Sequence, residues 1–184
     1  MKNSTFIIAL GVCSTLFACN SSDETTGKAD GVDLRGYTNQ AHVTTEDANF
    51  MDKAAFGGMM EVDVAKIAVQ SANPKVKAFA EQMITDHTKA NNELKALAYQ
   101  KGIILPDVYN AEQKEEMAKM KAMSGADFDK HYIDMMVKDH SETIELFEKG
   151  EKSLSIDVTE FAENTLPVID GHYKLAKEIQ SSLK

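Results

Sequence analysis

The chain has 184 residues, of which 43% are hydrophobic, and it carries a net charge of −9. This length and composition suit a single domain with a sizeable core. The chain has no basic stripe that could neutralise phosphates, so nucleic acid is excluded as an expected partner. Charge would not draw it to an anionic membrane surface either.

The first 18 residues have the pattern of a bacterial lipoprotein signal peptide. Lys2 gives a short positive start, and Thr5 to Phe17 form a mostly apolar run. That run is shorter than the roughly 20 residues of a membrane-spanning helix. It ends in Leu-Phe-Ala-Cys, which resembles the lipobox that precedes a lipidated cysteine. We therefore expect cleavage before Cys19 and anchoring in a lipid bilayer through acylated Cys19; an ordinary secretory peptide is the alternative.

The rest of the N-terminal region agrees with a protein of the cell envelope. The other cysteine, Cys13, lies in the segment expected to be removed, so no disulfide is expected in the mature domain. Residues 19–43 are polar and lack apolar periodicity, which predicts a flexible tether. Asn20 stands where an inner-membrane retention signal of enteric lipoproteins would have aspartate. We expect outer-membrane attachment, with the domain facing the periplasm or the cell surface.

Apolar periodicity, caps and helix breakers predict an all-α domain over residues 44–184. We expect helices over about 45–71, 74–101, 111–123 and 125–150, and from 157 to the C-terminus. The caps and breakers behind these bounds are Thr44 with Asp47, Asn73 with Pro74, Gly102, Asn110 with Gln113, Ser124 with Gly125, Gly150, and Asp157 with Glu160. Pro167 should bend the last helix. Four long helices with brief connections imply an antiparallel four-helix bundle, with the helix at 111–123 as an extra short element between the second and third long helices.

Three of the long helices each carry a histidine in the middle of an apolar stripe. His87, His140 and His172 occupy these central positions, flanked by apolar residues in steps of three and four. The segments at 83–88 and 136–141 share the pattern Met-x-x-Asp-His-Thr/Ser. The repeat indicates duplicated helical hairpins or a shared demand on one site. Asp86 lies about 100° around the helix from the stripe, so we expect an outer or surface role for it.

Glu61 of the first long helix lies at a depth that matches the histidines. At about 1.5 Å per residue, the four positions fall within a turn or two of one layer in an antiparallel bundle. Gly57 and Ala65 on either side leave room for the carboxylate to point inward. The pair Gly57-Gly58 indicates either close approach of two helices or ligand access. The sequence thus predicts a site of one carboxylate and three imidazoles, Glu61, His87, His140 and His172.

Several motifs together resemble an uncharacterised bacterial family labelled as outer membrane proteins, a domain of unknown function with a ferritin-like four-helix fold. The matching stretches within about residues 45–183 are Phe56-Gly57-Gly58 with Glu61-Val62, Ala72-Asn73-Pro74, Met83-x-x-Asp86-His87-Thr88, Ser124-Gly125, Met136-Val137-x-x-His140, and Leu166-Pro167 with His172. The resemblance implies a fold and no established activity. Ferritin-like relatives hold two metal ions with Glu-x-x-His pairs. Here Ile84, Val137 and Ile169 stand three residues before the histidines, which argues against a two-metal oxidase site.

The remaining possibility for a cofactor is one transition-metal ion. Neutral imidazoles with one carboxylate suit zinc, iron, manganese or copper(II). Met83 and Met136, each one turn from a histidine, are weaker candidate ligands that would favour copper(I). The alternative is a non-catalytic interaction or stress-related lipoprotein whose Glu/His network is purely structural. No nucleophile–base pair, phosphate loop or Cys-x-x-Cys motif indicates an enzyme, and no protein partner can be named.

Overall fold

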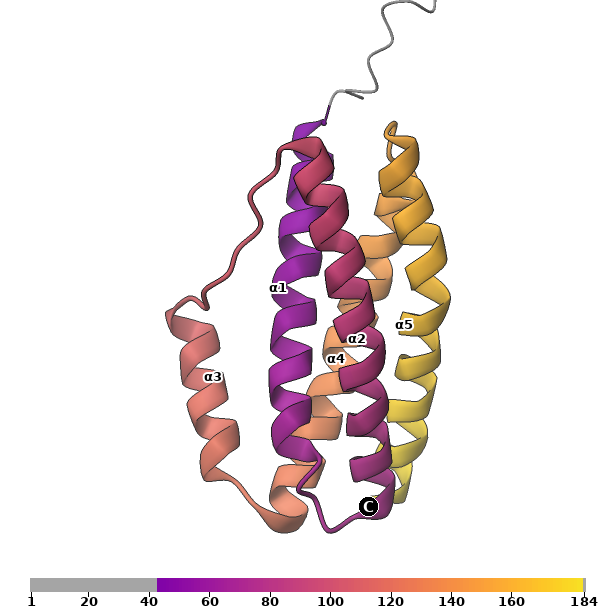
Figure 1. The fold of residues 1–184 in the computed structure, drawn as a ribbon. Helices are drawn as coiled ribbons and strands as arrows, with labels where there is room; N and C mark the ends of the chain where they lie inside the picture. The colour runs from indigo at the N-terminus through magenta and orange to yellow at the C-terminus, as the bar shows by residue number, and fades with distance from the viewer. Residues whose placement is uncertain (1–42, 184) are drawn as a thin grey trace, which may run out of the picture. The chain divides into compact units, whose positions relative to one another are not determined.

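The computed structural model describes residues 43–183, and every regular element among them is a helix. The helices are α1 (Thr45–Ala68), α2 (Pro74–Lys101), α3 (Ala111–Ala122), α4 (Gly125–Gly150) and α5 (Ile156–Ser182). The four long helices lie side by side as a helical bundle, in which α1 and α5 each contact both α2 and α4 (Figure 1). The short helix α3 lies outside this group and contacts α1. The predicted all-α class is therefore confirmed.

The predicted signal peptide, Cys19 and all but the last residue of the tether at 19–43 lie outside the described residues. None of the five helices just named is both long enough and apolar enough to cross a membrane.

Local hydrogen bonds fix the predicted helix ends. At the start of α1, the Asp47 amide donates to the Thr44 hydroxyl over 3.0 Å, and the Thr44 amide donates to the Asp47 carboxylate over 3.1 Å. Asn110 and Gln113 form the same reciprocal pair before α3. Gly102 follows α2 with a φ of 68°, a left-handed conformation that favours glycine. These caps confirm the sequence signals at three helix ends.

Two predicted helix ends differ from the structure: α1 ends three residues earlier than predicted, and the N-cap of α5 is Ser155 instead of Asp157. Helix α1 ends at Ala68. Ser71 lies in the turn after it, where its hydroxyl donates to Asp129 of α4 over 2.6 Å. Helix α5 begins at Ile156, and the carbonyl of Ser155 accepts its first amide bonds. Asp157 does not cap this helix; its carboxylate pairs with Lys101 of α2 over 3.0 Å.

Two apolar clusters fill the interior of the bundle, one on each side of a polar layer. The first cluster includes Val64, Val76, Phe79, Met83, Phe128, Tyr132, Met136 and Ile179. The second includes Phe50, Met51, Leu94, Leu97, Phe147, Val158, Ala162 and Ile169. On every long helix, one buried polar residue lies between the two clusters along the chain: Glu61, His87, His140 or His172. The apolar stripes thus hold four polar side chains at one level.

Gly150, at the end of α4, allows the second cluster to pack closely. A Cβ atom there would lie 2.7 Å from Cε2 of Phe50 and 3.1 Å from Cβ of Ala162. We expect Gly150→Ala to lower the free energy of unfolding by about 1–3 kcal/mol through overpacking, measured by urea denaturation. Gly57→Ala is the matched control, because a Cβ there meets nothing within 4 Å, and it should raise stability by up to about 1 kcal/mol. Similar effects of the two substitutions would contradict this packing explanation.

Candidate metal centre

Three imidazole rings meet in the polar layer, one each from α2, α4 and α5. The ring centroids of His87 and His140 are 5.5 Å apart, those of His87 and His172 5.2 Å, and those of His140 and His172 5.5 Å. His140 has no exposed surface, and His172 and His87 are 1% and 7% exposed. The three rings are therefore shielded from bulk water.

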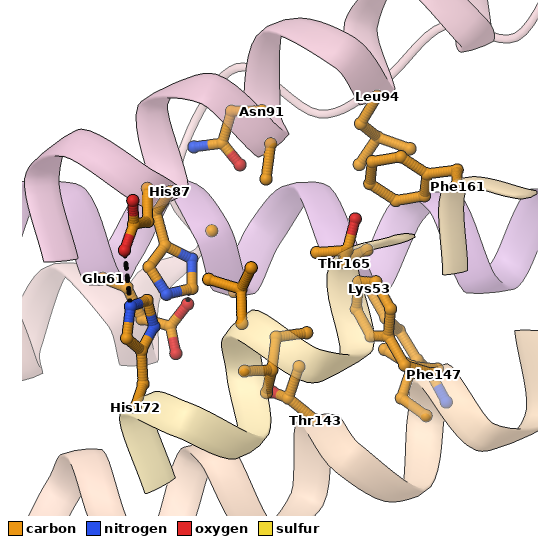
Figure 2. Close-up of a pocket in the computed structure, with 18 residues that line it drawn as sticks. Lys53, Glu61, His87, Asn91, Leu94, Thr143, Phe147, Phe161, Thr165 and His172 are labelled. Atoms are coloured by element: carbon orange, nitrogen blue, oxygen red, sulfur yellow. Dashed lines mark hydrogen bonds and ion pairs between the residues drawn. The ribbon is translucent and has the colours of Figure 1, made fainter. Parts of the chain in front are cut away.

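Carboxylates hold one nitrogen of each ring. The two oxygens of Glu61 lie 3.1 Å from Nδ1 of His87 and 3.3 Å from Nδ1 of His140. The latter nitrogen also lies 3.0 Å from the carbonyl oxygen of Met136. Nε2 of His172 lies 2.9 Å from a carboxylate oxygen of Asp86. Figure 2 shows His87, Glu61 and His172 gathered at one end of the view. The acceptors beside His140 and His172 fix the tautomer and orientation of those rings, and the Glu61 carboxylate lies within ion-pair distance of Nδ1 of His87.

The opposite nitrogens are buried and have no partner among the described protein groups. They are Nε2 of His87, Nε2 of His140 and Nδ1 of His172. With the other nitrogen of each ring protonated, these three atoms carry lone pairs. One nitrogen from each of the three rings can be chosen so that all lie within 4.8 Å of one another. Buried polar atoms without a partner are uncommon and call for a ligand, an ion or water.

Burial keeps the imidazoles of His87 and His140 neutral. It lowers the pKa of His87 to about 3 and that of His140 to about 4, and nearby Glu61 only partly offsets the latter. Burial also raises the pKa of Glu61 to about 7, against the opposing effect of His140. At neutral pH, His87 and His140 are thus in the uncharged form that binds metal ions.

Comparison with known proteins gives a family and a fold. The family model described as a domain of unknown function, DUF4142, matches residues 34–179. The chain belongs to this family. The crystal structure of a DUF305 fragment from Deinococcus radiodurans is similar, with a TM-score of 0.68 and 11% sequence identity over 76% of this chain and 97% of that chain. At this identity the likeness shows the fold alone. No curated protein matches the chain significantly.

The structure brings together all four main site residues predicted for this DUF4142 chain, but it gives Glu61 another position. Both of its oxygens face ring nitrogens, those of His87 and His140. Asp86 lies beside His172, and the outer role expected for it stays a prediction. The side chains of Met83 and Met136 belong to the first apolar cluster. Cys19, the predicted lipidation residue, lies outside the described part of the chain.

Tyr132 is a polar residue near the layer that the sequence did not single out. Its hydroxyl is buried without a partner among the described groups. Burial first, and the charge of Glu61 second, raise its pKa above the usual value, so the phenol stays protonated. In the sequence, Tyr132 is a tyrosine two turns before His140 on the apolar side of the same helix. This position alone does not distinguish it from an ordinary core residue.

The outer position of Glu61 can be tested in this DUF4142 protein. If the ring nitrogens bind a metal ion with Glu61 as an outer partner, Glu61→Gln should weaken that binding by about 10–100-fold, because a carboxamide has one carbonyl oxygen in place of the two carboxylate oxygens that face the rings. Isothermal titration with zinc, with Glu148→Gln at an exposed position of α4 as the control, measures the loss. A loss as large as that caused by removing a histidine would show instead that Glu61 is a direct ligand.

Proposed function

We propose that the protein binds one transition-metal ion through His87, His140 and His172. The observation that supports this most strongly is the set of three buried ring nitrogens without protein partners, each on a ring whose other nitrogen is held by an acceptor. The same pattern occurs in protein metal sites, where an outer carboxylate or carbonyl orients each ligating histidine. A purely structural network would be expected to use both nitrogens of these rings.

The spacing of the nitrogens suits a metal ion after a small movement. One nitrogen from each ring can be chosen so that all three lie within 4.8 Å of one another, and some point then lies within about 2.8 Å of all three. Because zinc–nitrogen bonds are about 2.0–2.1 Å long, the rings need to move inward by roughly 0.7 Å at most. Rotations of buried rings about their side-chain bonds can supply a shift of this size.

The donor set narrows the metal to zinc or copper. Imidazole nitrogens suit zinc and copper, whereas manganese prefers carboxylate and water oxygens. Glu61 and Asp86 face imidazole nitrogens, so the three available ligand atoms are all nitrogens. Divalent copper and zinc also bind such sites more tightly than divalent iron or manganese.

The cellular setting that we propose is the envelope. The lipobox-like segment before Cys19 and the polar stretch after it support a lipoprotein that holds this domain at a membrane, with the outer membrane favoured by Asn20. We also propose that the bundle has the antiparallel, ferritin-like arrangement of its four long helices. Together these features support a metal-binding or metal-buffering lipoprotein rather than an enzyme.

Elemental analysis of the protein, purified without affinity tag or chelator and then reconstituted, tests the metal proposal. We expect one equivalent of zinc or copper per chain and a higher melting temperature in the presence of the metal, because the ion binds only the folded state. Substoichiometric metal after reconstitution with zinc, copper, iron and manganese, with no thermal shift from any of them, would overturn it. The polar layer would then be a structural network completed by water.

The anchor has its own test. Cells that express the protein and grow with labelled palmitate should incorporate the label into it, and Cys19→Ser should remove that label. Cys13→Ser, in the segment expected to be cleaved, is the matched control and should keep it. Label that persists in Cys19→Ser would contradict lipidation at this residue.

A further inference from the structure

We propose that the metal ion keeps one coordination position open to a small, partly open cavity and that this position takes a neutral molecule of two or three heavy atoms. This inference rests on the proposed metal site and adds the class of ligand. Three histidines leave at least one position of a four-coordinate ion for another ligand. The geometry of the cavity decides which ligands can reach that position.

The cavity begins at the polar layer and extends into the second apolar cluster. Its volume is about 40 Å³, and His87, His172 and Glu61 line one end. Leu94, Phe147 and Phe161 lie toward the other end, as Figure 2 shows. His140 is not part of its wall, so an ion held by all three rings would meet the cavity on the side of His87 and His172. The partnerless nitrogens of those two rings belong to residues that line this space.

Size limits the ligand. One water molecule needs about 10–15 Å³ of cavity volume on this measure. A volume of about 40 Å³ therefore accepts two or three heavy atoms, and it excludes a ring such as free imidazole or a tetrahedral anion such as phosphate.

Charge favours a neutral ligand over an anion at the histidine end. The carboxyl groups of Glu61 and Asp86 lie beside the rings, and the adjoining wall is largely apolar. As carboxylates these two groups offset the two positive charges of a divalent ion, so an added anion would leave a net negative charge in this wall at a high desolvation cost. The one lysine of the wall, Lys53, has an exposed side chain, so its ammonium group can stay in water.

Asn91 adds a hydrogen-bonding group to the cavity, and Gly58 makes its position possible. Asn91 lies one turn after His87 on α2 and lines the cavity. A Cβ atom on residue 58 would lie 2.1 Å from Oδ1 of Asn91, so only glycine lets the carboxamide pack against α1. The pair Gly57-Gly58 therefore serves both close helix approach and the cavity wall, because Gly57 also lines this space. The carboxamide can hydrogen-bond a ligand atom beyond the metal.

Cobalt(II), which replaces zinc at nitrogen sites, gives a spectroscopic test with nitric oxide as the neutral two-atom ligand. We expect one equivalent of nitric oxide to change the visible and electron paramagnetic resonance spectra of the cobalt-loaded protein, while imidazole leaves both unchanged. Azide is an anion of similar size. It should bind to the cobalt-loaded protein at least about tenfold more weakly than to a reference complex in which a solvent-exposed tris-imidazole ligand holds cobalt(II). An imidazole response equal to that of nitric oxide, or no response to nitric oxide, would overturn the inference.

A pair of variants tests whether the cavity is the route. Ala90 lines the cavity one turn from His87, whereas Ala96 on the same helix is exposed and does not. Ala90→Leu should weaken nitric oxide binding by at least about tenfold with cobalt stoichiometry unchanged, because the larger side chain fills the space. Ala96→Leu should behave as the wild type.

If Ala90→Leu does not fold, the comparison of nitric oxide, imidazole and azide on the wild-type protein still decides the question. Cobalt that loads without a nitric oxide response would refute only this inference, whereas failure of every metal to load would refute the metal site itself.

Discussion

Replacement of His140 by alanine should weaken zinc or copper binding by more than about a hundredfold, because even the loss of an outer partner of a metal ligand costs about 10–100-fold. His140 has no exposed surface, and its Nδ1 lies between Glu61 and the Met136 carbonyl, so its Nε2 can point only into the layer. The remaining two imidazoles cannot hold the ion with comparable affinity. Isothermal titration and metal analysis after dialysis would measure the loss.

His131→Ala is the matched control for this substitution. His131 is also on α4, but its Nε2 lies 2.6 Å from Glu116 of α3 and the side chain is half-buried outside the layer. We expect wild-type metal content in this variant. Because His140→Ala also leaves a void in the core, its circular dichroism and melting temperature without metal must show a folded protein. A folded His140→Ala protein with wild-type metal content would show that the wrong residues have been assigned as ligands.

The sequence predicted which residues meet in the layer because depth along a helix follows from counting residues. Each residue advances the helix by about 1.5 Å, so the distances from the caps placed Glu61 and the three histidines at one level. The sequence could not predict which side-chain atoms face the centre of the layer, since that depends on helix rotation and on side-chain rotamers. For this reason the prediction of Glu61 as a ligand was reasonable, although both of its oxygens face imidazole nitrogens.

The parts of the fold that depend on residues close together in the sequence could be predicted. Reciprocal caps such as Thr44 with Asp47 depend on neighbours three residues apart, and the helical bundle follows from the apolar stripes. The start of α5 was less predictable because Asp157 has a competing partner, Lys101, which lies 56 residues away along the chain. The antiparallel ferritin-like arrangement stays a prediction, as does everything inferred from Cys19 and the tether.

The buried carboxyl group of Glu61 should give the metal-free protein a characteristic response to pH. Burial is the main cause that raises its pKa from the ordinary value of 4.5 for glutamate to about 7 in the folded protein. Between these two values the folded state binds a proton that the unfolded state does not. The stabilising contribution of Glu61 is therefore fully present below about pH 4.5 and is lost as the pH rises through about 7.

Other groups of the layer and its surroundings titrate in the same window, so the wild-type curve alone does not isolate Glu61. Folded His87 and His140 stay neutral where the unfolded histidines are charged, which lowers stability as the pH falls below about 6.5. Burial raises the pKa of Asp139 to about 6, so its contribution has the same sign as that of Glu61. The carboxyl groups thus offset the cost of keeping the histidines neutral.

Comparison of Glu61→Gln with the wild type removes these shared contributions. We expect stability of the variant, measured by urea denaturation with a chelator present, to fall more steeply than that of the wild type as the pH decreases from 7 to 4.5. The expected difference in slope is about 1.4 kcal/mol per pH unit, the value for one proton. Glu148→Gln should follow the wild type. Parallel curves for Glu61→Gln and the wild type would mean that Glu61 is ionised in the folded layer at acidic pH. At least one of the two neighbouring imidazoles would then have to be protonated to stabilise this buried anion.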